Sequence, residues 1–358
     1  MIRTLLRPTA FVDSPFGRDG KVARLTGGLV WFSAVELIET DGRKRTKTEL
    51  VPVEGIEQRF DEDMAAKWRA LTSARTALKV GERTIRLDQP QVMGIINVTP
   101  DSFSGDGQSD DAAAAAARGA DMAAGGAAIV DVGGESTRPG AKPVWEGDEI
   151  ARVAPVVRQL ASAGTAVSID SRKADVMTAA LEAGAGMIND VSALTYDDRS
   201  AAVVAGGGVP VILMHHQGPP ETMQQDPRYD DVLVEVYLWL EERIAAAEDA
   251  GIARDLILVD PGFGFGKNVG HNLELMNGLA LLHGLGCPIV VGASRKRTIG
   301  ALSNEAPVDR RLGGSIAFAL KAAEQGTQIV RVHDVAETVQ ALGIWRGLRD
   351  QALTPRIA

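Results

Sequence analysis

Eight short hydrophobic runs, each ending on or carrying a polar or ionisable residue, constrain the fold of this chain more than any other feature. They begin at about residue 91 and read VMGIIN, AAIVDV, VSID, MIND, VPVILMHH, LILVD, PIVVGASRK and QIVRVHD. A strand buried on both faces, as in a parallel sheet, is a continuous run of Val, Ile and Leu. Polar residues at the ends of such strands would be costly in a core, but they suit the open rim of a barrel. The runs therefore predict eight strands with the chemistry at their carboxyl ends.

Helical patterns separate these runs. Glycine residues 125 and 126 end an alanine-rich segment, and further helices are predicted over residues 146–161, 173–183, 198–205, 232–250, 272–283, 309–325 and 336–348. Eight alternations of strand and helix indicate βαβ units and a parallel sheet. They favour an α/β fold of the closed (β/α)8 TIM barrel type over residues 89–358. A doubly wound open sheet is the alternative, although it would usually leave one strand less apolar than any of these.

Residues 1–88 follow another pattern and are interpreted as an N-terminal α+β extension. They contain the apolar run LVWFS, the alternating piece ERTIRL and a predicted helix over residues 61–78. Met64, Trp68 and Leu71 recur at helical spacing and are expected to pack. The basic run from Arg43 to Arg45 is interpreted as a solvated turn. We expect an appendage of unknown role. Removal of residues 1 to about 86 should leave a soluble barrel with most of its activity and lower thermal stability.

Charge and cysteine content narrow the class of protein. A net charge of −9 argues against broad nucleic-acid binding, which needs a basic face. No apolar run approaches the roughly 20 residues that span a membrane, and the N-terminus lacks the apolar core of a signal peptide. The single cysteine, Cys287, can form neither an intrachain disulfide nor a thiolate metal cluster. These features predict a cytoplasmic protein with no nucleic-acid or membrane partner.

Basic residues gather at the ends of the last two runs. Arg295, Lys296 and Arg297 follow the seventh, and Arg331 and His333 end the eighth. This quadrant of an α/β barrel is a frequent phosphate site, and guanidinium groups bind phosphate oxygens in pairs. The sequence therefore predicts a phosphorylated ligand.

The segment LVDPGFGFGKN follows the sixth run and lacks the GxxxxGK[ST] spacing of a phosphate loop. Its glycines allow backbone and two phenylalanines to approach a flat ligand, and Asp260 can accept two N–H bonds from an aminopyrimidine. Asn189 offers both a donor and an acceptor to the same ring edge. A guanine-like or pterin ring would fit these groups.

A hard cation is a better guess than zinc for this chain. His215 and His216 are adjacent, so in an extended chain they point to opposite sides, and no HExxH motif is present. Magnesium needs only one or two protein oxygen ligands beside a substrate phosphate, and Asn97 is a candidate. The polar, glycine-rich loops after the first two runs are where lids belong.

Together these motifs closely resemble the dihydropteroate synthase family. The resemblance covers about residues 91–350 and rests on MGIINVTPDSFS, DVGGESTRPGA, SIDSRK, MINDVSAL, VILMHHQGPPETMQ, LVDPGFGFGK, GASRKRTIG and IVRVHDV, in family order. It implies a transferase of folate biosynthesis that joins 6-hydroxymethyl-7,8-dihydropterin diphosphate to 4-aminobenzoate and releases diphosphate. It also implies Mg²⁺, a homodimer and a target of sulfonamides.

The resemblance assigns roles to individual residues. The pterin-binding positions are Asp170, Asn189, Met214, Asp260, Phe265 and Lys296. The diphosphate positions are Asn97, Arg331 and His333, with Asn97 also at the metal. The aminobenzoate site and its loops take Phe103, Thr137, Arg138, Pro139 and Arg297. Asp170, Lys296 and Arg331 are the expected catalytic residues.

Three positions depart from the family pattern. The first loop reads SFSGDG where SFSDGG is usual, which displaces its acid to Asp106. The third run continues SIDSRKADV instead of SVDTSKPEV, and Arg297 stands where many members have Ser. A pterin-dependent methyltransferase and a non-catalytic pterin-binding paralogue are the alternatives. The SRK, RVHD and STRPG motifs favour the synthase over the methyltransferase, which has no diphosphate to hold.

Overall fold

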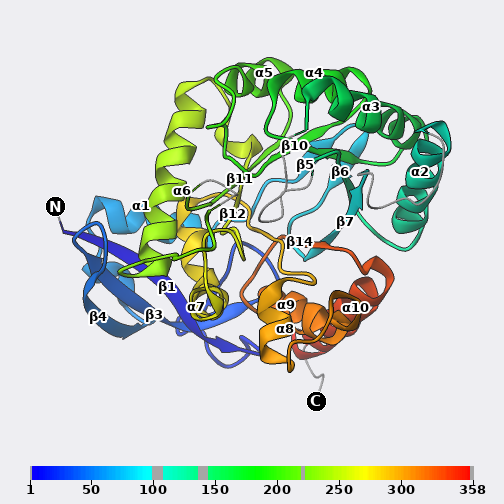
Figure 1. Ribbon diagram of the computed structural model, residues 1–358. Coiled ribbons are helices and arrows are strands. Elements are labelled where there is room, and N and C mark those ends of the chain that lie inside the picture. The colour runs from blue at the N-terminus through cyan, green and yellow to red at the C-terminus, as the bar shows by residue number, and fades with distance from the viewer. Residues whose placement is uncertain (1, 99–107, 136–143, 219–221, 355–358) are drawn as a thin grey trace.

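The computed structural model describes residues 2–98, 108–135, 144–218 and 222–354, and its centre is a closed parallel barrel (Figure 1). Eight strands are hydrogen-bonded in the order β12-β11-β10-β9-β8-β7-β14-β13, and a parallel bridge between Val259 and Ile289 closes the ring. The strands are β7 (Gln91–Asn97), β8 (Ile129–Gly133), β9 (Val167–Asp170), β10 (Met187–Asp190), β11 (Val211–Met214), β12 (Ile257–Asp260), β13 (Val290–Val291) and β14 (Ile329–Val332). The predicted (β/α)8 barrel is confirmed.

Helices surround the barrel. They are α2 (Gln108–Ala124), α3 (Glu146–Ser162), α4 (Ala174–Glu182), α5 (Ser200–Gly207), α6 (Val232–Asp249), α7 (Val269–Gly278), α8 (Arg297–Leu302), α9 (Leu312–Glu324) and α10 (Val335–Ala352). The helix expected over residues 272–283 is instead α7 followed by a 3-10 helix, η4 (Leu279–Leu285), which is buried except at Gly284. Two shorter 3-10 helices are η3 (Arg254–Leu256) and η5 (Val308–Arg310). No helix in the described part of the chain is long and apolar enough to cross a membrane.

A hairpin from the N-terminal extension fills the amino-terminal end of the barrel. It consists of β5 (Leu78–Val80) and β6 (Arg83–Ile85), and its turn meets Gly186, where a Cβ would lie 2.0 Å from the backbone nitrogen of Gly81. Its apolar side chains and those of the strands form one cluster: Leu78, Val80, Ile85, Leu87, Met93, Ile129, Ala166, Met187, Ile212, Leu258, Val290 and Ile329. The hairpin precedes residue 89, yet it packs as part of the barrel core. We call this apolar cluster the plug.

The rest of the extension is an antiparallel sheet with one helix. The sheet comprises β1 (Arg3–Val12), β2 (Ala23–Arg24), β3 (Trp31–Thr40) and β4 (Arg45–Pro52), followed by η1 (Ile56–Arg59) and α1 (Glu62–Thr72). One face, including Leu6 and Phe32, packs on α1. The other face, with Leu5 and Ile38, joins the barrel core, and β1 and α1 contact η4. Figure 1 shows this sheet beside α6 and α7.

The helix expected over residues 61–78 is shorter than the sequence indicated. It begins after Asp61, whose side chain accepts a hydrogen bond from the backbone of Met64 at 2.8 Å, and it ends at Thr72. Leu78 belongs to β5 instead, because its side chain is buried in the barrel plug. Tertiary burial therefore overrides the local helical pattern.

Candidate active site

The polar residues of the barrel lie one layer above its apolar plug, at the carboxyl ends of the strands. Alternate side chains of a strand share a face, so residues two positions apart point the same way. Two positions beyond the apolar layer, the strands carry Asp131, Asn189, Met214, Asp260 and Arg331. We call these five residues, with Asp170 from the end of β9, the polar layer. All but Arg331 are buried, and Arg331 is partly buried.

Arg331 is the hub of the polar layer. Its Nε donates to Oδ2 of Asp131 at 2.6 Å, and one Nη donates to Oδ2 of Asp170 at 2.6 Å. Asn189 donates to the same oxygen of Asp131 at 3.0 Å. Oδ1 of both aspartates is buried and accepts no hydrogen bond from the described residues. A guanidinium has five N–H donors. Two of them hold Arg331 between the aspartates, and the others can donate to a ligand.

The charges of this layer depend on one another. Burial raises the pKa of Asp170 to about 7; Arg331 opposes this shift, and Asp131 adds to it. Burial acts to lower the pKa of Arg331, but the two aspartates outweigh it, so the pKa is raised and the guanidinium stays charged. Burial also raises the pKa of Asp260, against the opposing effects of the Gly262 N–H and nearby cations. The layer thus combines a permanent cation with carboxyl groups that can exchange protons.

The loop between β12 and α7 is folded around a buried lysine. Lys267 Nζ donates to the carbonyls of Gly262 and Phe265, both at 3.0 Å, and lies 2.8 Å from Nδ1 of His215. Burial lowers the pKa of His215 well below its ordinary value, so the neutral ring can accept this bond. Gly262 has φ 68°, and a Cβ there would lie 1.9 Å from the carbonyl oxygen of His215. Its N–H donates to Asp260 at 2.7 Å and orients that carboxylate.

A strained residue precedes Lys296. Arg295 has φ 57°, a left-handed conformation that costs a non-glycine residue roughly 1–2 kcal/mol. It is held by a bond from its N–H to Ser315 at 3.0 Å and by an ion pair with Asp334. Lys296 Nζ then lies 4.2 Å from the ring centroid of Phe265, in a cation–π contact. The guanidinium of Arg295, expected at a phosphate, is instead paired with Asp334.

His333 and Asn97 lie near the rim. Nδ1 of His333 is 3.1 Å from the hydroxyl of Ser294. Burial, with Arg295 and Arg331, lowers the pKa of His333 to about 4, so the ring is neutral at pH 7. Asn97 ends β7, opposite Gly133 of β8, and is half-buried.

A second buried network of charged residues lies beside the mouth of the barrel, which is its opening at the carboxyl ends of the strands. Lys173 Nζ donates to Glu149 and to the carbonyl of Val144, both at 2.6 Å, and pairs with Glu135 at 2.8 Å. Ser171 donates to Glu149 at 2.8 Å. Glu135 and Val144 flank residues 136–143 along the chain. Lys173 therefore connects Glu135 and Val144 to the end of β9.

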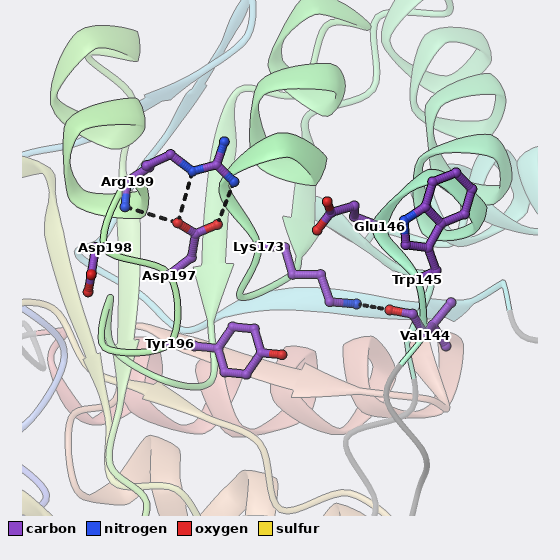
Figure 2. A pocket seen from close by; sticks show the side chains of 8 residues that line it. All are labelled: Val144, Trp145, Glu146, Lys173, Tyr196, Asp197, Asp198 and Arg199. Atoms are coloured by element: carbon purple, nitrogen blue, oxygen red, sulfur yellow. Dashed lines mark hydrogen bonds and ion pairs between the residues drawn. The ribbon is translucent and has the colours of Figure 1, made fainter.

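An open cavity of about 570 Å³ adjoins this network at Lys173. Figure 2 shows the side chains that line it. Trp145 and Tyr196 are exposed on its walls. Its lining residues are Val144, Trp145, Glu146, Lys173, Tyr196, Asp197, Asp198 and Arg199. None of them belongs to the polar layer, so this cavity is separate from the centre of the barrel.

Comparison with known proteins agrees with this geometry. A family model described as pterin binding enzyme matches residues 93–333. Dihydropteroate synthase of Escherichia coli K12 is 47% identical over 262 residues, 73% of this chain and 92% of that protein. The enzyme of Neisseria meningitidis serogroup B is 45% identical over 280 residues, 77% of this chain and 98% of that protein.

Two solved structures of the Xanthomonas albilineans enzyme are also similar. The one with 4-aminobenzoic acid has a TM-score of 0.73 at 47% identity. The one in complex with 7,8-dihydropteroate has a TM-score of 0.70 at 45% identity. Each comparison covers 78% of this chain and 100% of the other.

The chain belongs to the dihydropteroate synthase family. Its activity is that of a transferase in folate biosynthesis, which joins 6-hydroxymethyl-7,8-dihydropterin diphosphate to 4-aminobenzoate and releases diphosphate. The family match begins at residue 93, so the N-terminal sheet is an addition to the dihydropteroate synthase barrel.

The structure brings most of the predicted dihydropteroate synthase residues to one end of the barrel. Asp170, Asn189, Met214, Asp260 and Arg331 lie in the polar layer; Phe265 and Lys296 form their contact beside it, and Asn97 and His333 lie near the rim. Arg297 begins α8 and is exposed. Four predicted residues and the displaced acid lie outside the described residues: Phe103, Thr137, Arg138, Pro139 and Asp106. The individual roles stay predictions.

Sequence reasoning missed two residues that organise the site. Asp131 lies in the second run, two residues beyond Ile129 and therefore on the same inward face of the strand. This alternation was the signal that could have identified it. Lys267 was noted only as part of a segment that is not a phosphate loop. Its role depends on burial against His215, which no spacing reveals.

Proposed function

We propose that the polar layer binds the pterin ring inside the barrel and its diphosphate at the rim. Asp260 accepts hydrogen bonds from the aminopyrimidine edge, and Asn189 bonds the same edge. Met214 and Phe265 cover the ring faces, with Lys296 beside them. The main support is the meeting of buried Asp131, Asp170, Asn189 and Asp260 with the partly buried Arg331 at one end of an otherwise apolar barrel.

Charge drives the proposed chemistry. As the bond between the pterin methylene carbon and the diphosphate oxygen breaks, its electron pair leaves with diphosphate. Arg331, with His333 and Asn97, stabilises that developing charge. Asp170 stabilises positive charge on the methylene and ring. The amine of 4-aminobenzoate forms the new carbon–nitrogen bond and then loses a proton, with no covalent enzyme intermediate. Asp131 holds Arg331 in place.

We also propose a magnesium requirement. The described residues hold no group of three or more His, Cys, Asp or Glu side chains arranged for a metal ion. The donor set at the mouth nevertheless suits a hard cation, because Asn97 offers an amide oxygen and Asp131 and Asp170 each have an unbonded carboxylate oxygen. A bound Mg²⁺ would supply further neutralisation of the diphosphate.

For 4-aminobenzoate we propose binding between the two loops and the start of α8, by Phe103, Thr137, Arg138, Pro139 and Arg297. The Xanthomonas albilineans structure with 4-aminobenzoic acid and a Yersinia pestis structure with a sulfonamide drug support a site of this kind. Strand-end residues are placed before any substrate arrives. We therefore expect pterin diphosphate to bind first and 4-aminobenzoate second.

Asp260→Asn tests the pterin site. Asn keeps an acceptor for the Gly262 N–H but removes the charge and presents a donor to the ring donors. Leaving buried donors unpaired costs roughly 1–3 kcal/mol, or about one to two decades in affinity. Leu258→Met, one layer below, is the matched control. Calorimetry showing equal pterin affinity in Asp260→Asn and wild type would remove Asp260 from the site.

Diphosphate release separates the synthase from its alternatives. The purified protein with Mg²⁺ and both substrates should release diphosphate and form dihydropteroate. A non-catalytic paralogue would bind pterin diphosphate without releasing diphosphate at any aminobenzoate concentration. A methyltransferase would show no dependence on 4-aminobenzoate.

Finally, we propose a homodimer in the cytoplasm. Leu302, Val308, Leu312, Ile344 and Leu348 are exposed on the α8–α10 side of the barrel. Large exposed apolar residues grouped in this way are typical of an interface. Light scattering should give twice the chain mass, and Ile344→Lys with Leu348→Lys should give a monomer. The buried, reduced Cys287 is compatible with a reducing compartment.

A further inference from the structure

The N-terminal sheet contacts α6 at two different levels. Arg3 forms a two-bond ion pair with Glu241, at 2.6 and 2.7 Å. Arg45 pairs with Asp231 through both its Nε and one Nη. The same Nη lies 3.5 Å from Oε1 of Glu274 in α7. Asp231 precedes α6 at its N-terminus, whereas Glu241 is ten positions later, about 15 Å along the helix axis. Because βα loops lie at the carboxyl ends of the strands, the Arg45 contact reaches the end of the barrel that holds the polar layer, whereas the Arg3 contact does not. An exposed ion pair between Arg43 and Asp230, at 3.4 Å, lies beside the Arg45 contact.

This contact corrects the interpretation of the basic run as a solvated turn. The Arg43 side chain is 77% exposed, as expected, but that of Arg45 is 27% exposed and that of Asp231 only 6%. Asp231 also accepts the backbone N–H groups of Leu233 and Val234, both at 3.1 Å, so it caps α6. Arg45 thus fixes the point at which the β11–α6 loop ends.

The end of that loop is hydrogen-bonded to the glycine-rich loop between β12 and α7 (residues 261–268), which we call the glycine loop. Tyr229, two residues before Asp231, donates its hydroxyl to the carbonyl of Gly266 at 2.9 Å. Its ring packs edge-on against His271 of α7, with centroids 4.9 Å apart. Gln224, earlier in the loop, donates to the carbonyl of Gly264. Movement of the β11–α6 loop would therefore move the backbone around residues 264–266.

That backbone carries the residues around the proposed pterin site. Gly266 lies between Phe265, whose ring contacts Lys296, and Lys267, which bonds the carbonyl of Gly262. Gly262 in turn orients Asp260. A continuous series of contacts therefore links the extension to the pterin side of the mouth.

We propose that Arg45 is a positioning residue, through which the N-terminal extension braces the β11–α6 loop and so holds the glycine loop in its pterin-binding form. The proposal rests on the assignment of Asp260 and Phe265 to the pterin site. It gives the N-terminal sheet, which lies outside the family match over residues 93–333, a task in the pterin site. Arg45 touches no substrate in this scheme.

Arg45→Met and Arg3→Met form a matched pair, since both remove a cation that joins the same sheet to the same helix. Titration calorimetry with 6-hydroxymethyl-7,8-dihydropterin diphosphate should show about 5-fold weaker binding for Arg45→Met and less than about 2-fold change for Arg3→Met. At saturating pterin diphosphate, KM for 4-aminobenzoate should change by less than about 2-fold in both. Hydrogen exchange at the Gly262 and Gly264 amides should quicken only in Arg45→Met.

Asp231→Asn completes the test, because Asn keeps the helix cap and loses the charge. In that background Arg45→Met should weaken pterin binding less than it does in the wild type, because only the contact with Glu274 remains to be lost. Arg45→Lys should restore part of the affinity lost in Arg45→Met. Equal pterin affinity in Arg45→Met and wild type, or equal losses in Arg45→Met and Arg3→Met, would overturn the brace. If Asp260→Asn also binds pterin normally, the site assignment fails; if only Arg45→Met does, the brace alone fails.

Discussion

The two ends of the barrel differ in chemistry although the same strands build both. At the amino-terminal end, strand residues such as Ile129, Leu258 and Ile329 pack with the β5–β6 hairpin in an apolar layer. Two positions later on the same faces stand Asp131, Asp260 and Arg331. A rise of about 3.3 Å per residue separates these layers by about 7 Å. The apolar layer thus contributes mainly to stability and the polar layer to the reaction. Substitutions in the two layers should therefore have separable effects on stability and on activity.

Removal of the plug should have the largest effect. Leu78, Val80, Ile85 and Leu87 bury four apolar side chains, each worth about 1.5–3 kcal/mol. Their sum, about 6–12 kcal/mol, is comparable to the whole stability of a typical domain, about 5–15 kcal/mol. Deletion of residues 1–87 should therefore give no cooperative thermal transition.

Deletion of residues 1–73 is the matched control for the plug, because it removes the sheet and α1 and keeps the hairpin. It should give a folded, less stable barrel that still forms dihydropteroate. This changes the expectation from the sequence, which placed a viable truncation at about residue 86. Similar melting curves for the two truncations would show that the hairpin is dispensable.

Loss of the hub should be the next largest effect. Arg331→Met leaves Asp131 and Asp170 buried without their cation, and breaking a buried ion pair costs about 3–5 kcal/mol. Turnover should fall about 100-fold or more, since the diphosphate loses a charged donor. Chemical denaturation and a diphosphate-release assay measure the two effects. An Arg331→Met enzyme of normal stability would show that the two ion pairs of Arg331 do not contribute to stability.

A smaller effect is expected in the pH dependence of pterin binding. Burial raises the pKa of Asp260, while the Gly262 N–H and the cations Lys296, Arg331 and Lys267 act to lower it. Affinity should be full above this pKa and fall as pH drops through it. Lys267→Met removes a cation that acts to lower this pKa, so the acid limb should move to higher pH. Calorimetry from pH 5 to 8 would show it, and a shift to lower pH would contradict this sign.

The smallest effect is expected in the apolar layer, one step below the hub on the same strand. Ile329→Val removes one methylene from the plug and should cost about 0.5–1.5 kcal/mol of stability. Pterin affinity should be unchanged. A variant that lost pterin affinity without losing stability would show that the two layers are not separable.

Much of this division could be predicted from the sequence, because a buried parallel strand leaves an apolar run and its open end leaves a polar residue. The barrel and the end that holds the chemistry follow from that pattern, and family motifs add the expected roles of Asn189 and Met214. The pairing of Arg331 with Asp131 could not be found this way, since 200 positions separate them. The surface on which the ERTIRL segment packs could not be predicted either, because an alternating pattern indicates a strand but not what the strand covers. A basic turn likewise gives no local sign that Arg45 is half-buried against Asp231.

Plugging one end of the barrel also has a kinetic consequence. With the hairpin in place, substrates and products reach the polar layer through the same opening. In the proposed binding mode dihydropteroate keeps its pterin in the deepest position, so the next pterin diphosphate should not enter until the product has left. Accumulated dihydropteroate should then act as a competitor of pterin diphosphate, and the turnover of the enzyme becomes tied to how quickly the next step in the cell removes its product.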